Sequence, residues 1–326
     1  MIELLLRVTI RQKRMSHPTK PPTALDIRSA LQEGMARLRA AHVPSHTLAG
    51  ELLLLYVLNR DRTWLYTHSE DPIETAAAEQ YFALITRRAA GEPTQYLTRK
   101  QEFWGLEFEV TPAVLIPRPE TEHIVEVALE RLGSRGIKVN VTTGEPSPPL
   151  RIADVGTGSG CLAVALAREL PHAEIFATDI SAPALEVARR NAARHSVSNR
   201  IHFVQTDLLE ALQCSPITNQ LSPGFDLIVS NPPYVARTEA ASLQREVREH
   251  EPDSALFGGA TGIEIYERLT EQAAALLAHG GILAVELGYG AADTVRKILQ
   301  ARGHWANVST TNDLAGIPRV LAAERA

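Results

Sequence analysis

The tetrapeptide Asn231-Pro232-Pro233-Tyr234 combines residue types that can bind a planar NH₂ group. Proline lacks an N–H donor and has a fixed φ angle, so the segment offers acceptors, namely the Asn231 side-chain oxygen and the Pro232 carbonyl. An amide or exocyclic amine nitrogen is a poor nucleophile because its lone pair is delocalised. Two acceptors would hold both of its hydrogens, align the lone pair with an electrophilic methyl group and raise electron density as the bond forms, while Tyr234 packs on the planar group. This pattern favours methyl transfer to nitrogen without a metal; an ordinary proline-rich turn is the alternative.

A glycine-rich turn, Gly156-Thr157-Gly158-Ser159-Gly160, separates a predicted strand from a predicted helix. Its glycines allow a tight turn and let a ligand approach the backbone, where free N–H groups at the start of the helix can meet polar atoms. A plain strand-to-helix turn accounts for one or two glycines but poorly for three. The dinucleotide-binding fingerprint requires glycine at the sixth position, where this chain has Cys161.

Acidic residues near the ends of three successive predicted strands favour a positively charged nucleoside cofactor. They are Asp154, Asp179 and Asp207. The carboxyl ends of parallel strands meet in one crevice, in which Asp179 can accept both hydroxyls of a ribose. The carboxylate of Asp207 or the amide of the neighbouring Leu208 can meet an adenine edge. We therefore expect S-adenosylmethionine, whose sulfonium and ammonium groups are both positive.

Strands and helices alternate from residue 121 onward, which predicts βαβ units and a parallel sheet. The predicted strands are 151–155, 174–178, 201–205, 226–230 and 281–286. The predicted helices between the first three are 161–170 and 182–195. The tetrapeptide follows the fourth strand and the glycine-rich turn follows the first, so this sheet would bring both to one edge.

The first part of the chain has a different periodicity. Ile27, Leu31, Met35 and Leu38 recur at helical spacing, a second helix carries the apolar stripe Leu48, Leu52, Leu55 and Tyr56, and a third covers about 73–88. This pattern predicts a small helical domain. Leu106, Phe108 and Val110 then alternate with acidic residues, which predicts a half-buried strand in a β-hairpin between the domains.

Charge and composition exclude several classes of protein. Of the formal net charge of −5, residues 1–23 contribute +4, residues 24–98 contribute −2 and the rest −7. Proteins that grip nucleic acid usually have a basic body, so this acidic body argues against stable nucleic-acid binding. The two cysteines, Cys161 and Cys214, cannot form a disulfide framework, and no apolar run approaches the roughly 20 residues of a membrane span. We expect a cytoplasmic protein.

Three further features of the chain give rise to minor expectations. The first residues predict an initiator at Met15, with an organelle-targeting segment as the alternative. Residues 133–149 and 213–224 are rich in turn-forming residues and predict irregular insertions. His250 has no second His or Cys at ligand spacing, so we expect no metal site.

The combination of Asn-Pro-Pro-Tyr with this glycine-rich turn resembles the amino-methyltransferases that act on exocyclic base amines or glutamine amides. Two segments narrow the resemblance to the release factor glutamine methyltransferases (the HemK family). They are Glu102-Phe103-Trp104-Gly105 with Phe108, and the run Leu115-Ile116-Pro117-Arg118-Pro119-Glu120-Thr121-Glu122. Further similar residues are Gly91-Glu92-Pro93, Tyr96, Glu251-Pro252, Ala255-Leu256, Gly258-Gly259 and Asp313-Leu314-Ala315-Gly316. The resemblance extends from about residue 24 to the end.

The resemblance implies a Rossmann-like, seven-stranded methyltransferase domain of the α/β class that depends on S-adenosylmethionine. The implied organisation is a basic tail (1–23), a helical substrate-recognition domain (24–98), a β-hairpin linker (99–120) and the methyltransferase domain (121–326). The implied reaction is N5-methylation of the glutamine in the Gly-Gly-Gln motif of class I peptide chain release factors, by a monomer.

Site residues follow from the resemblance position by position. The cofactor would be held by Gly156, Thr157, Gly158, Ser159, Gly160, Asp179, Asp207, Leu208 and Asn231. Asn231 and Pro232 would orient the glutamine amide, with Pro233 and Tyr234 lining its slot; catalysis is assigned to Asn231, Pro232 and Tyr234. Arg118, Glu120 and Thr121 would either border this pocket or fix the linker.

Three alternatives share some of these motifs. A ribosomal-protein glutamine methyltransferase has the same tetrapeptide but typically a different run after Pro-Arg. An adenine-N6 methyltransferase acting on nucleic acid shares the catalytic loop but calls for a basic channel and a place for a flipped base. A non-catalytic binding module would not need intact motifs. The chain departs from the family at Ala260-Thr261, where an acidic residue is common, and at Leu208, where some members have an aromatic residue.

Overall fold

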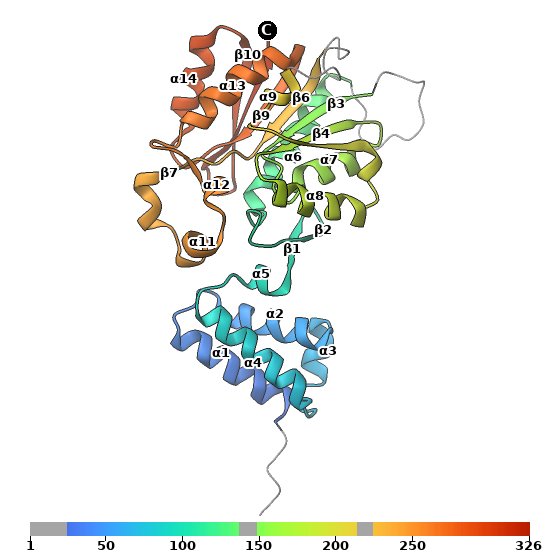
Figure 1. Cartoon of the computed structure of the whole chain (residues 1–326), viewed down its shortest axis with the longest axis vertical. Helices are drawn as coiled ribbons and strands as arrows, with labels where there is room; N and C mark the ends of the chain where they lie inside the picture. The colour runs from blue at the N-terminus through green and yellow to red at the C-terminus, as the bar shows by residue number, and fades with distance from the viewer. Residues whose placement is uncertain (1–24, 137–148, 214–223) are drawn as a thin grey trace, which may run out of the picture. The chain divides into compact units, whose positions relative to one another are not determined.

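The computed structural model describes residues 25–136, 149–213 and 224–326 (Figure 1). The chain divides into two compact units, one ending at Ile85 and the other beginning at Thr86. The predicted basic tail, Cys214 and most of the two predicted insertions lie outside the described residues. None of the helices in the described ranges is both long and apolar enough to cross a membrane.

The first unit is helical, as the periodicity predicts. It consists of α1 (Ile27–Ala40), α2 (His46–Leu58), α3 (Arg62–Thr67) and α4 (Thr75–Ala89) up to Ile85. Gly34 of α1 packs directly against the buried Tyr81 of α4. A Cβ at Gly34 would lie 2.1 Å from the tyrosine oxygen, so only glycine fits there. The core of this unit forms where small residues of α1 and α2 pack against the Tyr81 ring.

The apolar stripe on α2 faces outward. Leu48, Leu52 and Tyr56 are 47%, 40% and 38% exposed, whereas Leu53 and Leu54 are fully buried. The α2 sequence is apolar on every side, so periodicity alone could not identify its inner face. Ala49 and Gly50 lie on the buried side, where small residues permit close packing.

The second unit contains a sheet of seven strands within the described residues, in the order β10-β11-β9-β6-β3-β4-β5. These strands are β3 (Arg151–Val155), β4 (Glu174–Asp179), β5 (Ile201–Gln205), β6 (Phe225–Ser230), β9 (Leu277–Glu286), β10 (Trp305–Asn312) and β11 (Pro318–Arg325). Five neighbouring strands are parallel, and β11 runs antiparallel to both β9 and β10. The predicted α/β fold class is confirmed, and so are the five predicted strands; the periodicity had not indicated β10 and β11.

Helices cover both faces of the sheet (Figure 1). The longer ones are α6 (Glu122–Ser134), α7 (Cys161–Glu169), α8 (Ala182–Arg194), α13 (Glu264–Leu276) and α14 (Ala292–Arg302). The unit also has the short helices α5 (Thr94–Thr98), α9 (Glu210–Gln213), α11 (Arg245–His250) and α12 (Asp253–Leu256). Alternate residues of each strand enter opposite cores: Ile152 packs with α6 and α7, and Ala153 with α13 and α14.

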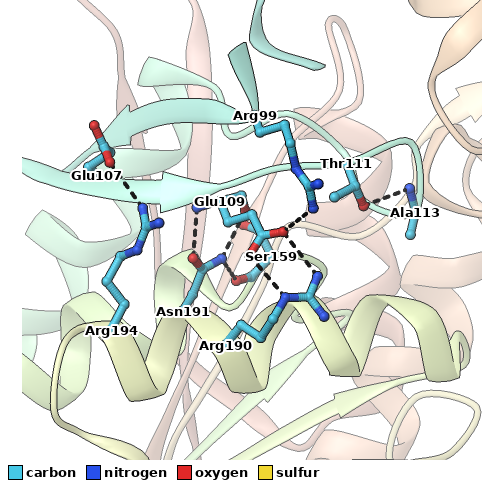
Figure 2. Close-up of polar contacts among 9 residues, drawn as sticks. All are labelled: Arg99, Glu107, Glu109, Thr111, Ala113, Ser159, Arg190, Asn191 and Arg194. Carbon is cyan, nitrogen blue, oxygen red and sulfur yellow. Dashed lines mark hydrogen bonds and ion pairs between the residues drawn. The ribbon is translucent and has the colours of Figure 1, made fainter. Parts of the chain in front are cut away.

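The predicted hairpin is present as β1 (Lys100–Phe103) and β2 (Leu106–Glu109), paired antiparallel. Asn191 of α8 joins it to the glycine-rich turn (Figure 2). The Asn191 Oδ1 accepts from the Glu109 N–H at 2.7 Å, and Nδ2 donates to the carbonyls of Glu109 and Ser159, both at 2.9 Å. Figure 2 also shows Arg190 and Arg99 on the Glu109 carboxylate. One fully buried side chain thus fixes the hairpin and the turn together.

Replacing Asn191 by Ala should lower the free energy of unfolding by about 2–4 kcal/mol, because it leaves a buried N–H and two carbonyls without partners. Urea unfolding would measure this loss. The control is Arg194→Ala on the same helix; it removes an ion pair with Glu107 between side chains 43% and 51% exposed and should cost about 0.5 kcal/mol or less. Equal stabilities of the two variants would contradict the role of Asn191.

Candidate functional site

The glycine-rich turn leaves β3 and opens α7 with three left-handed residues. Gly156, Gly158 and Gly160 have φ angles of 70°, 55° and 80°. A Cβ at Gly156 would meet no atom within 4 Å, whereas one at Gly160 would lie 3.0 Å from the Cβ of Ala188. Gly156 therefore keeps space open for a ligand, and Gly160 lets α7 pack closely on α8.

A cavity of about 250 Å³ lies beside this turn, and we call it the glycine-loop cavity. Of the residues assigned to the cofactor from the resemblance, all except Gly160 line it; Asp154, the third acidic residue expected in this crevice, does not line it because it is fully buried. The lining includes Thr157, Ser159, Asp179, Asp207, Leu208 and Asn231. The fold therefore brings together residues from the ends of four strands, as the alternation of elements predicts.

Asp179 and Asp207 supply the acidic wall of this cavity. The Asp179 oxygens accept from the Gly158 and Ser181 N–H groups, each at 2.9 Å. A carboxylate has about four lone-pair sites, so both oxygens can still accept ligand hydroxyls. Burial raises the pKa of Asp179. Asp207 pairs with Arg268 at 2.6 Å, an arginine that the sequence did not indicate. Acidic groups and an open glycine cradle fit a nucleoside cofactor that carries positive charge.

A second cavity of about 510 Å³ lies on the other side of Asn231, and we call it the arginine cavity. Its lining includes Gln95, Arg118, Pro232, Tyr234, Glu246 and Glu251. Three residues, Leu115, Asn231 and Ala255, border both cavities. Of the predicted substrate-binding residues, Asn231, Pro232 and Tyr234 line the arginine cavity, while Pro233 lines the glycine-loop cavity. Asn231 thus stands between two sites.

The tetrapeptide is held by close backbone packing. It leads from β6 into β7 (Val235–Ala236), which pairs with β8 (Phe257–Gly259). A Cβ at Gly258 would lie 2.4 Å from the Pro233 carbonyl oxygen, and one at Gly262 would lie 2.3 Å from that of Tyr234. Only glycine allows this approach, which explains Gly258 of the pair noted in the sequence.

Arg118 and Glu251 form an ion pair at the wall of the arginine cavity. The Arg118 Nη2 lies 2.6 Å from the Glu251 Oε1, with side chains 33% and 1% exposed. Burial raises the pKa of Glu251. Arg118 therefore borders the pocket, one of the two roles open to it from the sequence, and its remaining N–H groups can meet acceptors in the cavity.

Two buried acids lie behind the site. Asp154 is fully buried; its Oδ2 accepts from the Thr157 hydroxyl at 2.6 Å and the Ala163 N–H at 3.1 Å, and its Oδ1 has no partner among the described residues. These two hydrogen bonds tie the glycine-rich turn to the first turn of α7, and burial raises the pKa of Asp154 to about 7. Glu286 at the end of β9 is also buried; the sequence did not indicate it, because it occupies an ordinary strand position.

The described residues contain no group of three or more His, Cys, Asp and Glu side chains arranged to hold a metal ion. The pKa of Tyr234, whose hydroxyl donates to Glu286 at 3.2 Å, is raised mainly by burial. The two cavities are lined by backbone, amide and hydroxyl groups, by carboxylates, and by the arginines Arg118 and Arg268.

Two family models match the chain. Residues 29–98 match the PrmC N-terminal domain, and residues 139–250 match the methyltransferase small domain. A release factor glutamine methyltransferase of Koribacter versatilis is 42% identical over 303 residues, which cover 92% of this chain and 99% of the relative. That of Chlorobaculum tepidum is 43% identical over 275 residues, covering 84% and 89%.

Solved structures with the same fold are more distant in sequence. The hMettl16 catalytic domain in complex with MAT2A 3′UTR hairpin 1 superposes with a TM-score of 0.52 at 15% identity, covering 83% of this chain and 90% of that chain. Its complex with hairpin 6 gives 0.51 at 17% identity, covering 74% and 81%. At this level of identity the likeness concerns the methyltransferase fold alone.

The buried Asp154 should make stability depend on pH. Its pKa rises from 3.8 to about 7 on folding, so between those values the folded protein holds a proton that the unfolded chain has lost. Unfolding free energy should therefore fall as pH rises through this window. Asp154→Asn keeps a neutral group, and the wild type should lose about 1–4 kcal/mol relative to it between about pH 5 and pH 8.

Urea unfolding at a series of pH values measures this difference. The exposed Asp293, with a side chain 87% exposed, provides the control, since Asp293→Asn should follow the wild-type profile. Parallel profiles for the wild type and Asp154→Asn would show that Asp154 is ionised throughout.

Proposed function

Because the chain belongs to the release factor glutamine methyltransferase family, we propose that it transfers a methyl group from S-adenosylmethionine to N5 of the glutamine in the Gly-Gly-Gln motif of class I peptide chain release factors. We also propose that it works as a monomer in the cytoplasm and does not bind nucleic acid stably. The observation that carries the proposal is the place of Asn231, which borders both the glycine-loop cavity and the arginine cavity.

In the proposed reaction the glycine-loop cavity holds the cofactor. Asp179 accepts the ribose hydroxyls with the lone pairs left beside its two backbone contacts. Asp207 and Leu208 also line this cavity, where they would meet the adenine. When bound, S-adenosylmethionine supplies an electrophilic methyl group on a positively charged sulfur.

The arginine cavity would hold the substrate glutamine. The Asn231 Oδ1 and the Pro232 carbonyl accept one hydrogen each from its side-chain nitrogen, which turns the lone pair toward the glycine-loop cavity. As the nitrogen–carbon bond formed, the carbon–sulfur bond would break and leave a neutral thioether (S-adenosylhomocysteine), and the two acceptors would stabilise the positive charge that develops on the nitrogen. One of the held protons then leaves to solvent. Tyr234 lines the same cavity, and Arg118 can donate to carbonyl oxygens of the bound loop.

The helical unit would recognise a second part of the protein substrate. Its outward stripe of Leu48, Leu52 and Tyr56 is an apolar surface that a release factor can cover. A protein substrate suits the acidic body of the chain, whose residues 24–326 carry a net charge of −9.

The function is tested with methyl-labelled S-adenosylmethionine, an unmodified class I release factor and the same factor with the glutamine of its Gly-Gly-Gln motif changed to alanine. We expect label on the first protein and not on the second. Equal labelling of both, or labelling only of added ribosomal protein or nucleic acid, would overturn the proposed substrate.

Asn231→Ala should lower kcat by about 10²–10³-fold, the usual effect of removing a group that stabilises charge in the transition state. Calorimetric affinity for S-adenosylmethionine should change by less than about threefold, since Asn231 supplies one part of a large lining. Asp179→Ala is the comparison variant, in which the loss should appear in binding: cofactor affinity should weaken by about tenfold or more. If Asn231→Ala keeps wild-type turnover, another group orients the amide.

The Leu48→Ser, Leu52→Ser double variant should raise KM for the whole release factor by about tenfold through lost apolar contact. Activity on a short Gly-Gly-Gln peptide should be unchanged, since the peptide reaches only the catalytic cavities. Gln80→Ser on exposed α4 surface is the control. An unchanged KM for the release factor in the double variant would exclude the stripe as a recognition surface.

A further inference from the structure

The orientation of the Asn231 amide decides whether this residue can act. An asparagine side chain presents an acceptor at one end and two donors at the other. Only the Oδ1 end can receive a hydrogen of the substrate nitrogen, because the Nδ2 end would place donor against donor. Some part of the protein must therefore hold Asn231 with Nδ2 turned away from the substrate.

The Nδ2 of Asn231 donates to the Thr121 Oγ1 at 2.9 Å. Thr121 in turn donates its hydroxyl hydrogen to the Glu286 Oε2 at 2.6 Å. Thr121 and Glu286 are each only 2% exposed, so their contact with each other is shielded from water, while Thr121 also lines the glycine-loop cavity beside Asn231. A chain of hydrogen bonds thus leads from the end of β9, through the short 3₁₀ turn Pro119–Thr121, to the tetrapeptide after β6.

The direction of this chain follows from the chemistry of its members. An ionised carboxylate only accepts hydrogen bonds, and a hydroxyl has a single hydrogen to give. Thr121 therefore donates its hydrogen to Glu286 and has only lone pairs left for Asn231. Asn231 must then donate to Thr121 through Nδ2. If Glu286 took up a proton, it would donate to Thr121, the hydroxyl hydrogen would turn toward Asn231, and the opposite amide orientation would be favoured.

Other groups around Glu286 keep the carboxylate in place. The Tyr234 hydroxyl donates to Oε1 at 3.2 Å, and the Tyr266 hydroxyl of α13 donates to the Glu286 backbone carbonyl at 2.8 Å. The nearby charges are Arg319 of β11, which favours the ionised form, and Glu120, which opposes it. Burial raises the pKa of Glu286 above its usual value.

We propose that Thr121 and Glu286 are positioning residues that fix the polarity of Asn231, holding its carbonyl oxygen toward the substrate amide. Neither residue needs to touch the reacting atoms. This inference rests on the proposed function, since it names what orients the group that receives the glutamine. It gives Thr121 a more specific role than the two left open by the resemblance, which were to border the pocket or to fix the linker.

Turnover is the first test. Thr121→Val removes the acceptor for Nδ2 and should lower kcat by about 10–100-fold with less than about a threefold change in KM for the release factor. Thr121→Ser keeps the hydroxyl and should restore most of the activity. Thr270→Val is the control, since Thr270 is also buried and its hydroxyl donates to the Glu267 carbonyl of its own helix; it should leave kcat unchanged.

The pH dependence of single-turnover rates is the second test. The wild-type rate should fall on the acid side as Glu286 takes up its proton, at a pH above the usual glutamate pKa. In Glu286→Gln the rate should be lower at neutral pH and this acid limb should disappear, because glutamine can either accept from Thr121 or donate to it. An unchanged acid limb in Glu286→Gln would contradict the proposal.

Hydrogen exchange of the Asn231 side-chain NH₂, followed by NMR in the protein without substrate, separates this inference from the proposed function. In the wild type one of the two protons should exchange more slowly than the other, and in Thr121→Val they should exchange alike. This result stands even if the substrate is not a release factor. Equal exchange of both protons in the wild type, or wild-type kcat in Thr121→Val, would overturn the positioning role.

Discussion

A carboxamide nitrogen can present its lone pair to a methyl donor only when both of its hydrogens are held by acceptors. This requirement accounts for the prolines of the tetrapeptide, which remove N–H donors from the loop. It also accounts for the proposed orientation of Asn231, with its side-chain oxygen toward the substrate nitrogen. The same requirement accounts for the position of Asn231 between two cavities, because in the proposed reaction the nitrogen is held from one side and methylated from the other.

The rest of the catalytic unit can be understood as support for this geometry. The parallel strands bring the glycine-rich turn, Asp179 and the tetrapeptide to one edge of the sheet. Gly258 allows β8 to pack against the tetrapeptide backbone. Asn191 fixes the turn, just before α7, to the end of the hairpin. A rigid frame is needed since neutral acceptors act only over hydrogen-bond distances.

Much of this arrangement was predictable from the sequence. Alternation of strands and helices gave the sheet, and glycine and proline at special positions marked the two loops, because their backbone requirements are local. The outer face of α2 was not predictable, as that helix is apolar all round. Glu286 was missed for a related reason: its partner Thr121 is 165 residues away in the chain, and no local pattern marks a buried strand carboxylate that accepts from a distant hydroxyl.

The most direct test of the central claim is a crystal structure of the enzyme with a Gly-Gly-Gln peptide and S-adenosylhomocysteine. If Asn231 and Pro232 hold the substrate amide, the glutamine side-chain nitrogen should lie about 2.7–3.2 Å from both the Asn231 Oδ1 and the Pro232 carbonyl oxygen. The cofactor sulfur should lie in the glycine-loop cavity, on the opposite side of that nitrogen from the bound peptide. A glutamine nitrogen that contacts neither acceptor, or that faces the Asn231 Nδ2, would contradict the account.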